Sequence, residues 1–466
     1  MKLCIIFNIV INCFKWFSHS FSSYHNLVIK QKELAKSMEQ TSQPIKSPET
    51  GVRVYPTQTE TQAFGRLRIQ CRTRGEVPIE NATISVSLPS DPETVIEQLT
   101  TDDSGLAPIV ELAAPPLNLS LEPNAEQPYS EYNLMVSAPN FESAVFSGIE
   151  ILPTVTANQN VLLNPQTAAT PSEEVFVILP HTLYYEYPPK IPEAEIKPTS
   201  ETGEIVLSRV VVPEYVIVHD GPPASNATNH YVLFRDYIKN VASSEIYATW
   251  PEETIYANVF AILSFTLNRV YTEWYRGQGY NFTITSSTAY DHKWINGRNI
   301  FSNIGLIVDS VFTNYLSRPN VTQPILTQYC DGNRVQCPGW MTQWGSKTLG
   351  DQGYTAIEIL RHFYGESIYI NTAIGVSGVP VSWPGYNLGI GASGDNVRTI
   401  QNQLNRIAEV YSAIPRIAAD GVYGQQTADA VRAFQQIFDL PVTGIVDQPT
   451  WYRISNIYVG VTRIGE

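Results

Sequence analysis

A stretch crowded with prolines divides this chain and limits what it can fold into. Seven prolines fall within residues 165–200: Pro165, Pro171, Pro180, Pro188, Pro189, Pro192 and Pro198. Proline fixes φ and lacks a backbone N–H, so such a stretch cannot form a long helix or a central strand. We therefore predict a linker over residues 165–204, exposed and open to proteases, with separate domains on either side.

Before this linker, residues 51–164 carry the pattern of a β-sandwich. Apolar residues alternate with polar ones, as in Leu67, Ile69 and Cys71, and turn formers such as those around Gly105 separate the runs. Period-two alternation indicates half-buried strands, and this spacing of turns is typical of sandwiches. The segment resembles the carboxypeptidase-regulatory or transthyretin-like sandwiches, and it contains no catalytic constellation.

After the linker, the pattern becomes mixed and then helical. Residues 205–375 begin with a Val- and Ile-rich strand over 205–218 and continue with a long apolar helix over 249–275, for which Thr249 and Glu252 predict a capping box. A second helix over 354–364 ends at Gly365. Residues 376–466 show apolar spacing of three and four residues, which predicts short helices. The expected fold is multidomain α+β.

Composition excludes several classes of function. The 466 residues give about three domains, and 30 Lys+Arg against 44 Asp+Glu leave a formal charge of −14. Nucleic acids and anionic membranes need clustered positive charge, so neither is an expected partner. The apolar run near Lys2 is too short to span a membrane. Residues 1–50 are interpreted either as a signal-like leader or as an extension that precedes a true start at Met38.

Five cysteines are too few for a scaffold built from disulfides. Cys330 and Cys337 could form a local disulfide, half of a metal site or two free thiols, and the sequence leaves these alternatives open. Because no CxxC or HxxxH partners lie nearby, we predict no metal site and no cofactor.

The C-terminal pattern resembles the three-helix peptidoglycan-binding domain. The motifs that carry the resemblance lie in residues 386–455: Gly394-Asp-Asn-Val397, Gln401, Leu404, Asp420-Gly-Val-Tyr-Gly424, Thr427, Val431, Phe434 and Thr443-Gly-Ile-Val-Asp447 followed by Trp451. The resemblance implies that a groove beside the turn at 420–424 binds glycan or stem peptide. Tyr423 and Trp451 are the aromatic candidates for that contact, although most of these residues are expected to form core.

Residues 210–370 resemble the SpoIID/LytB family of lytic transglycosylases. Two segments carry the resemblance, Tyr237–Asn258 with its Trp-Pro turn, and Gly339–Tyr364. The resemblance implies a catalytic glutamate early in the long helix, which is Glu253 here, with Glu245 as the runner-up. It also implies that Asp291 supports the acid, and that Gln343 and Trp344 position the substrate. A family histidine is replaced by Cys337, so no histidine or metal role carries over.

A lytic transglycosylase needs one carboxylic acid, which protonates the leaving oxygen and then accepts the proton of the sugar's 6-hydroxyl group. The N-terminus of a helix favours a carboxylate, so Glu253 can act as an acid only if apolar neighbours raise its pKa. A hydrolytic muramidase would need a second carboxylate, for which Asp291 is the candidate. A non-catalytic peptidoglycan-binding spore protein is the alternative from another class.

The order of domains resembles that of the clostridial spore cortex-lytic enzymes of the SleC type. This resemblance implies a zymogen in the spore cortex or extracytoplasmic wall, which a germination protease activates by cleavage in the linker. It implies peptidoglycan as the partner. The muropeptide preference, the processing site, the oligomeric state and the existence of residues 1–37 do not follow from the sequence.

Overall fold

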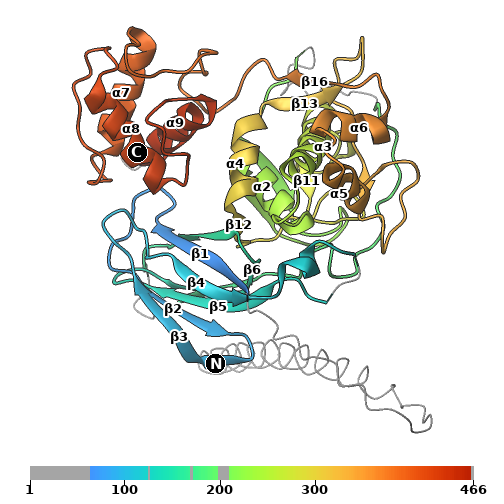
Figure 1. Cartoon of the computed structure of the whole chain (residues 1–466), viewed down its shortest axis with the longest axis horizontal. Coiled ribbons are helices and arrows are strands. Elements are labelled where there is room, and N and C mark those ends of the chain that lie inside the picture. Colours follow the sequence, from blue (N-terminus) through green and yellow to red (C-terminus); the bar gives the residue numbers. More distant parts are fainter. Residues whose placement is uncertain (1–62, 124–125, 168–171, 198–208, 463–466) are drawn as a thin grey trace, which may run out of the picture. The chain divides into compact units, whose positions relative to one another are not determined.

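The computed structural model describes residues 63–123, 126–167, 172–197 and 209–462. All of them belong to one unit, Glu60–Glu466. The leader predicted over 1–50 lies outside the described residues. The described part combines helices with several small sheets, which confirms the predicted mixed α+β architecture (Figure 1).

The predicted sandwich consists of two sheets that share one apolar core. Their orders are β3-β2-β5-β6-β8 and β12-β7-β1-β4. Leu67, Ile69 and Cys71 on β1 are fully buried, as the alternation predicts. The elements are β1 (Ala63–Arg72), β2 (Thr83–Leu88), β3 (Asp91–Thr100), β4 (Val110–Ala114), the 3₁₀ helix η1 (Leu117–Ser120), β5 (Ser130–Ser137), β6 (Ser143–Ile151), β7 (Thr156–Leu162), β8 (Glu173–Val177) and β12 (Ile300–Phe301).

The polar residues of β1 are buried too, which the alternation does not predict. Arg68 and Gln70 expose 9% and 2% of their surface. The Arg68 guanidinium donates to the carbonyl oxygen of Ile437, 2.6 Å away in the C-terminal helices. The second face of this sheet is therefore covered by protein instead of water.

The predicted linker differs from the observed chain. Residues Glu173–Val177 form β8, which pairs in parallel with β6, so the sandwich continues beyond residue 164. Residues 190–197 then pack against the central helices, and Lys197 exposes only 5% of its surface. Prolines exclude helix from this stretch as predicted, but an edge strand and a packed extended segment are both compatible with them.

The central part is built around a long buried helix. α3 (Glu252–Tyr271) is buried along nearly all of its length, as its apolar pattern predicts. Around it lie α2 (Phe234–Glu245), α4 (Ser302–Val311), α5 (Gln343–Asp351) and α6 (Ala356–Tyr364), with η2 (Arg276–Gln278). The small sheets are β10-β9-β11, β13-β16 and β14-β15. Their bounds are β9 (Tyr215–His219), β10 (Asn229–Leu233), β11 (Ile284–Thr285), β13 (Asn314–Ser317), β14 (Tyr329–Cys330), β15 (Met341–Thr342) and β16 (Tyr369–Thr372).

The helix ends confirm one sequence prediction and correct another. α6 ends at Gly365, whose φ of 91° lies in the left-handed region, and it starts with a capping box formed by Thr355 and Glu358. The capping box predicted at Thr249 is not formed. The Thr249 hydroxyl donates instead to Ser120 at 2.7 Å, and Pro251 occupies the N-cap position of α3.

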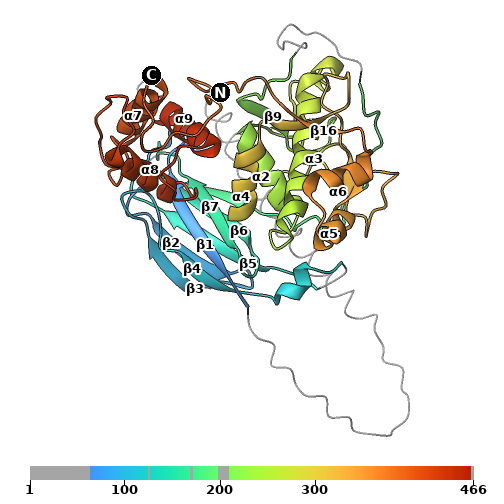
Figure 2. The ribbon, with the colours of Figure 1, turned by 45° about the horizontal axis from the view of Figure 1, so that its top comes forward.

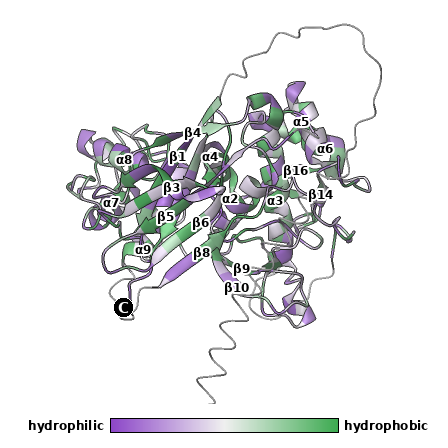
Figure 3. Ribbon diagram, turned by 90° about the horizontal axis from the view of Figure 1, so that it is seen from below, coloured by the Kyte–Doolittle hydropathy of each residue, from purple (hydrophilic) through white to green (hydrophobic). Residues whose placement is uncertain are grey.

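The C-terminal region folds into three amphipathic helices. They are α7 (Asp395–Ile407), α8 (Gln425–Ile437) and α9 (Gln448–Thr462). Leu404, Val431 and Phe434 are fully buried, which confirms the predicted core. Both hydrophobic and hydrophilic residues occur along α7 and α8 (Figure 3), and the buried ones recur at the spacing of three and four residues that an amphipathic helix requires.

The central part and the sandwich are joined by a shared sheet and a buried ion pair. β12 pairs antiparallel with β7, although it lies far later in the sequence. Figure 2 shows β7 next to α4 of the central part. Next to it, Arg298 bonds the carboxylate of Glu150 at 2.5 Å, with both side chains at most 1% exposed. Asn299 also exchanges two hydrogen bonds with the backbone of Glu150, each of 3.1 Å. The central domain is therefore held on the sandwich by specific polar contacts.

Candidate functional site

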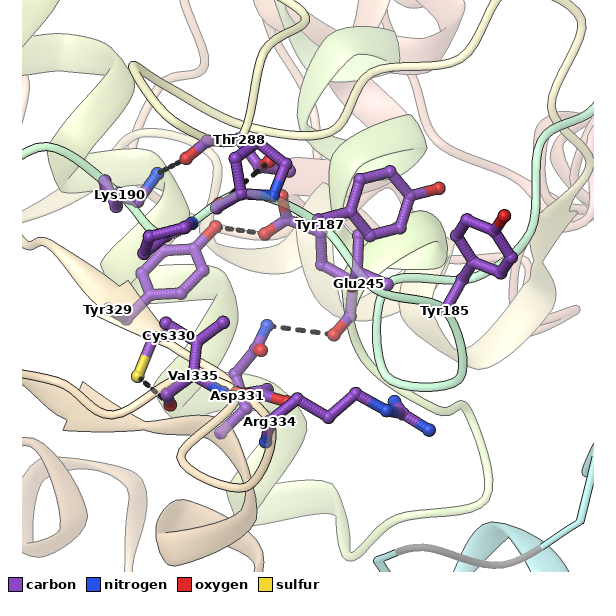
Figure 4. Close-up of a pocket in the computed structure, with 14 residues that line it drawn as sticks. Tyr185, Tyr187, Lys190, Glu245, Thr288, Tyr329, Cys330, Asp331, Arg334 and Val335 are labelled. Carbon is purple, nitrogen blue, oxygen red and sulfur yellow. Dashed lines mark hydrogen bonds between the residues drawn. The ribbon is translucent and has the colours of Figure 1, made fainter.

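Glu245 is a buried acid at the C-terminal end of α2. The preceding residues are small, and Ala242, Ser243 and Ser244 are all buried, so this end of the helix packs closely into the central part. The Glu245 side chain is 3% exposed. It lines a cavity of about 60 Å³ together with Lys190, Tyr329 and Gln343 (Figure 4).

Both carboxylate oxygens of Glu245 have hydrogen-bond partners. The backbone N–H of Lys293 donates to one oxygen at 2.5 Å, and the Tyr329 hydroxyl bonds the other. The Gln343 amide donates to the backbone carbonyl of Glu245 at 2.9 Å. The contacts from Lys293 and Tyr329 fix the carboxyl group in one orientation, and the contact from Gln343 holds the backbone of Glu245.

The surroundings of Glu245 favour its protonated form. Burial raises the pKa of the Glu245 carboxyl, although the charge of Lys190 and the hydrogen bonds from Lys293 and Tyr329 act against that rise. The helix dipole acts in the same direction as burial, because the C-terminal end of a helix carries partial negative charge. A carboxyl group with a raised pKa can donate a proton near neutral pH.

Lys190 contributes the cation of the cavity. Its ammonium group donates to the carbonyl oxygens of Thr288, at 3.3 Å, and of Asp291. It also lies 5.1 Å from the centre of the Phe265 ring. Burial lowers the pKa of Lys190 to about 8. The lysine is thus held by the central part even though it belongs to the stretch predicted as a linker.

Aromatic side chains form much of the cavity wall. Tyr185 and Tyr187 lie on one side of the Glu245 carboxyl group and Tyr329 on the other (Figure 4). Arg334 and Asp331 complete the polar lining. An apolar, aromatic wall with a few fixed polar groups is the usual composition of a small-molecule site.

Glu253, the glutamate predicted as catalytic, lies elsewhere. It sits in the first turn of α3 and is exposed. Its carboxylate accepts the backbone N–H of Ala356 at 2.6 Å, at the start of α6. It is not among the residues that line the cavity. Its observed contact is that of a helix cap, so a catalytic role for Glu253 stays a prediction that the geometry does not favour.

Asp291, predicted to support the acid, is fully buried and has all its bonds inside the protein. It accepts hydrogen bonds from Arg269 Nε (2.7 Å), the Tyr275 hydroxyl (2.7 Å) and both the N–H and the hydroxyl of Thr285 (2.8 and 2.7 Å). These four bonds match the roughly four hydrogen bonds that a carboxylate can accept. Asp291 therefore anchors Arg269 and the loop that carries the Lys190 contacts.

The two residues predicted to position substrate have different surroundings. Gln343 is 4% exposed and lines the cavity beside Glu245. Trp344 points into an aromatic cluster, where its ring centre lies 4.9 Å from that of Trp250 and 6.2 Å from that of Tyr247. Trp344 therefore belongs to this aromatic cluster and does not line the cavity.

The aromatic candidates of the C-terminal domain are core residues. Tyr423 is 1% exposed, and its hydroxyl donates to the carbonyl oxygen of Gly444 at 2.9 Å. Trp451 is fully buried, and its indole N–H donates to Val381 at 3.0 Å. Their contact with glycan stays a prediction, and the observed role of both rings is to hold the three helices together.

Cys330 and Cys337 form a disulfide, which is one of the three alternatives that the sequence left open. Cys330 follows Tyr329 on β14 and lines the cavity. The disulfide closes the loop that carries Asp331 and Arg334. Within the described ranges, no group of three His, Cys, Asp or Glu side chains is arranged to hold a metal ion.

Sequence reasoning missed Lys190 and Tyr329. Lys190 lies in the proline-rich stretch, where no motif marks it, and Tyr329 precedes a cysteine whose pairing was open. The sequence favours Glu253 and leaves Glu245 as the runner-up. The signal that favours it is its place at the end of a helix whose last residues are small and buried.

Comparisons with known proteins identify the C-terminal domain. Residues 393–454 match the family of peptidoglycan binding domains. No curated protein matches the sequence. Among the described helices, none has the length and apolar character that crossing a membrane requires.

Several solved structures resemble parts of the chain. The SleB N-terminal domain is 30% identical, with a TM-score of 0.15, over 16% of this chain and 99% of that structure. The Bacillus anthracis TIE protein is 17% identical, with a TM-score of 0.17, over 22% of this chain and 17% of that one. An Acinetobacter radioresistens catechol 1,2-dioxygenase mutant is 14% identical, with a TM-score of 0.18, over 26% of this chain and 59% of that one.

Proposed function

We propose that this chain, whose residues 393–454 match the peptidoglycan binding domains, is a peptidoglycan lytic transglycosylase with Glu245 as its acid and base. The observation that carries the proposal is the buried carboxyl of Glu245. It lies in an aromatic cavity, at the end of a helix that favours protonation, and its pKa is raised by burial. A match to a peptidoglycan-binding domain makes the glycan strand the natural substrate.

The geometry suits a mechanism that uses one carboxyl group twice. Protonated Glu245 donates its proton to the glycosidic oxygen that leaves C1 of the N-acetylmuramic acid residue. The resulting carboxylate then takes the proton of the 6-hydroxyl group while O6 bonds to C1, which closes a 1,6-anhydro ring and restores the acid. The fixed contacts to Lys293 and Tyr329 would hold the carboxyl group in place during both steps.

Glu245 suits this role better than Glu253 because the two glutamates lie at opposite helix ends. Glu253 is exposed in the first turn of α3, and its carboxylate caps α6. Glu245 is buried at a helix C-terminus, where both the dipole and desolvation favour the neutral acid. A general acid must carry a proton at the working pH, which Glu245 is placed to do.

The C-terminal domain supports a place in the cell wall, and the spore cortex is the wall that we propose. In this proposal the domain holds the enzyme on peptidoglycan while the central domain cleaves the glycan strand. We also propose that the chain is made as a zymogen that a germination protease activates. The packing of residues 185–190 around the Glu245 cavity supports that proposal, because these residues form part of the wall of a cavity of only about 60 Å³.

The test is mass spectrometry of the muropeptides that the chain releases from cortex peptidoglycan, before and after limited proteolysis. We expect 1,6-anhydromuramic ends from the processed wild type and from Glu253→Gln, and a loss of at least about 100-fold in Glu245→Gln, the usual scale of general acid catalysis. Reducing ends would instead indicate a muramidase, with Asp331 as the other carboxylate that lines the cavity. No release by folded, wall-binding protein would indicate a non-catalytic binder.

A further inference from the structure

We propose that residues 185–197, here called the strap, occupy the groove in which the peptidoglycan strand binds, and that Glu193 and Glu195 take the place of its carboxylates. The proposal rests on the function proposed above and names what regulates the same site. The strap is part of the stretch that the sequence predicts only as a proline-rich linker. The groove is the surface of the central part beneath the strap.

The second half of the strap is extended and has two different faces. Glu193, Glu195 and Lys197 turn toward the central part and are half-buried or buried, whereas Pro192, Ala194 and Ile196, which alternate with them, are exposed, Ile196 to 44%. This alternation is that of a single strand laid on a surface. The inward face is charged, so the groove beneath it recognises polar groups.

Side-chain amides bond the backbone of the strap at two places. Gln328 donates to the carbonyl oxygen of Ile191 at 2.8 Å and accepts the N–H of Glu193 at 2.9 Å. Gln323 in the same way bonds both the N–H and the carbonyl of Lys197, at 2.9 and 3.0 Å. An amide side chain that donates and accepts can bond any polymer that carries amide groups. Peptidoglycan offers such groups in its N-acetyl substituents and its stem peptides.

Two arginines of the groove hold the carboxylates of the strap. Arg269 donates to both oxygens of Glu193, at 2.9 and 2.6 Å, and Arg318 bonds both oxygens of Glu195, at 2.5 and 2.8 Å. Forked bonds of this kind are specific for planar carboxylates. The Nε of Arg269 is bonded separately by Asp291, so its fork stays aimed at the groove when Glu193 leaves. The groove therefore keeps a carboxylate site, which the acidic groups of a stem peptide can fill.

The strap itself links this surface to the Glu245 cavity. Gln328 is the neighbour of Tyr329, which bonds Glu245, and the first half of the strap supplies Tyr185, Tyr187 and Lys190 to the cavity wall. The cavity holds about 60 Å³, whereas ligand sites usually hold roughly 300–1,000 Å³. A sugar can reach Glu245 only after the strap moves away.

The experiment measures strand binding in the full chain with Glu245→Gln, so that no substrate is cleaved. The release variant adds Glu193→Gln and Glu195→Gln, and the matched control adds Glu186→Gln, a change to an exposed carboxylate of the same strap. The probes are soluble glycan strands with stem peptides and the same strands after an amidase has removed the peptides. The readout is amide hydrogen exchange of residues 323–329 by mass spectrometry.

We expect strands with peptides to slow this exchange about tenfold in the release variant, as a ligand at ten times its Kd does, and less than about twofold in the parent and the control. Equal protection in all three chains would overturn the proposal. So would no protection in the release variant, provided that its thermal unfolding matches that of the parent. Equal protection by peptide-free strands would overturn the assignment of the carboxylate site.

Because this readout needs no catalysis, it separates the two proposals. If Glu245 is not the acid, strand binding still follows the strap. If the strap is a permanent wall of the enzyme, the muropeptide experiment still succeeds while the release variant does not bind. A further variant, Lys190→Met, tests the first half of the strap by the same exchange measurement. In this variant we expect added strands to slow the exchange of residues 240–246.

Discussion

At the residue scale, the environment of a glutamate matters more than its place in a motif. Glu245 and Glu253 lie close together in the sequence, yet one is buried in a cavity and the other caps a neighbouring helix. Burial raises the pKa of the Glu245 carboxyl, whereas the Glu253 carboxylate is exposed and serves as a helix cap. Two predictions follow from this difference.

Glu245→Gln should stabilise the protein at neutral pH. The pKa of Glu245 is raised in the folded state, so the folded chain binds this proton more tightly than the unfolded chain does, and stability falls as pH rises from the unfolded value of about 4.3 through the folded value. Glutamine carries no charge and avoids this loss. We expect a higher Tm for the variant at pH 8 and no difference at pH 4, measured by calorimetry. A constant difference across pH would contradict the expectation.

Glu253→Ala should weaken α6 without removing activity. The Glu253 carboxylate accepts the N–H of Ala356, one of the first N–H groups of that helix, which have no partner within the helix. Loss of such a cap costs about 0.5–2 kcal/mol, which urea unfolding can measure. Muropeptide release by the processed variant, corrected for folded protein, should remain near that of the wild type. A loss comparable to that of Glu245→Gln would restore Glu253 as the acid.

At the element scale, the contact around β12 joins the central part to the sandwich. Arg298 and Glu150 form an ion pair with almost no exposed surface. Removal of one partner of a buried pair leaves an uncompensated charge and costs about 3–5 kcal/mol. We expect Arg298→Ala to lower the free energy of unfolding by that amount in urea.

Two further variants serve as controls for this prediction. Arg298→Met combined with Glu150→Gln removes both charges and should recover much of the loss. Arg432→Ala breaks the exposed pair with Asp429, which has exposed fractions of 38% and 53%, and should cost at most about 1 kcal/mol. If Arg298→Ala costs no more than Arg432→Ala, the buried pair is not what joins the domains.

The sequence predicts elements well where periodicity is strong. The alternation of β1, the apolar length of α3 and the amphipathic pattern of α7 and α8 are all confirmed. It predicts poorly where distant parts meet. Nothing near Ile300 indicates a strand of the sandwich, and nothing near Thr249 indicates that its hydroxyl bonds Ser120 instead of capping a helix. Such contacts depend on tertiary packing, which local patterns do not contain.

In the candidate site, too, the sequence predicts residues that belong to a local motif and misses those that distant parts of the chain bring together. Gln343 was predicted beside the substrate and lines the cavity, because it belongs to a motif with fixed spacing. The sequence does not point to Lys190, because this residue lies within the proline-rich stretch, where no motif marks it. The preference for Glu253 came from the motif alone, whereas burial and helix direction, which favour Glu245, require the structure.

At the scale of the whole molecule, a cut in the chain should not separate the sandwich from the rest. The sandwich is bonded to the central part through β12 and Arg298, and to the C-terminal helices through Arg68 and Asn158, whose amide lies 2.6 Å from Asp439. We expect a chain cut at a protease site inserted after Thr167 to elute as one species in size-exclusion chromatography, held by these contacts and by the pairing of β6 with β8, which the cut leaves on the second fragment. The two fragments should separate in urea. Separation without denaturant would show that these contacts are too weak to hold the parts together.

The pairing of β12 with β7 also bears on the order in which the chain is made. A ribosome completes β7 long before it reaches Ile300, so the nascent sandwich has an open edge at β7 during that interval. Open edges template pairing with other chains, and synthesis proceeds at about 5–20 residues per second. During synthesis, the edge of β7 therefore stays unpaired for several seconds after the sandwich strands have been made. A chaperone that binds strand edges would act at that stage.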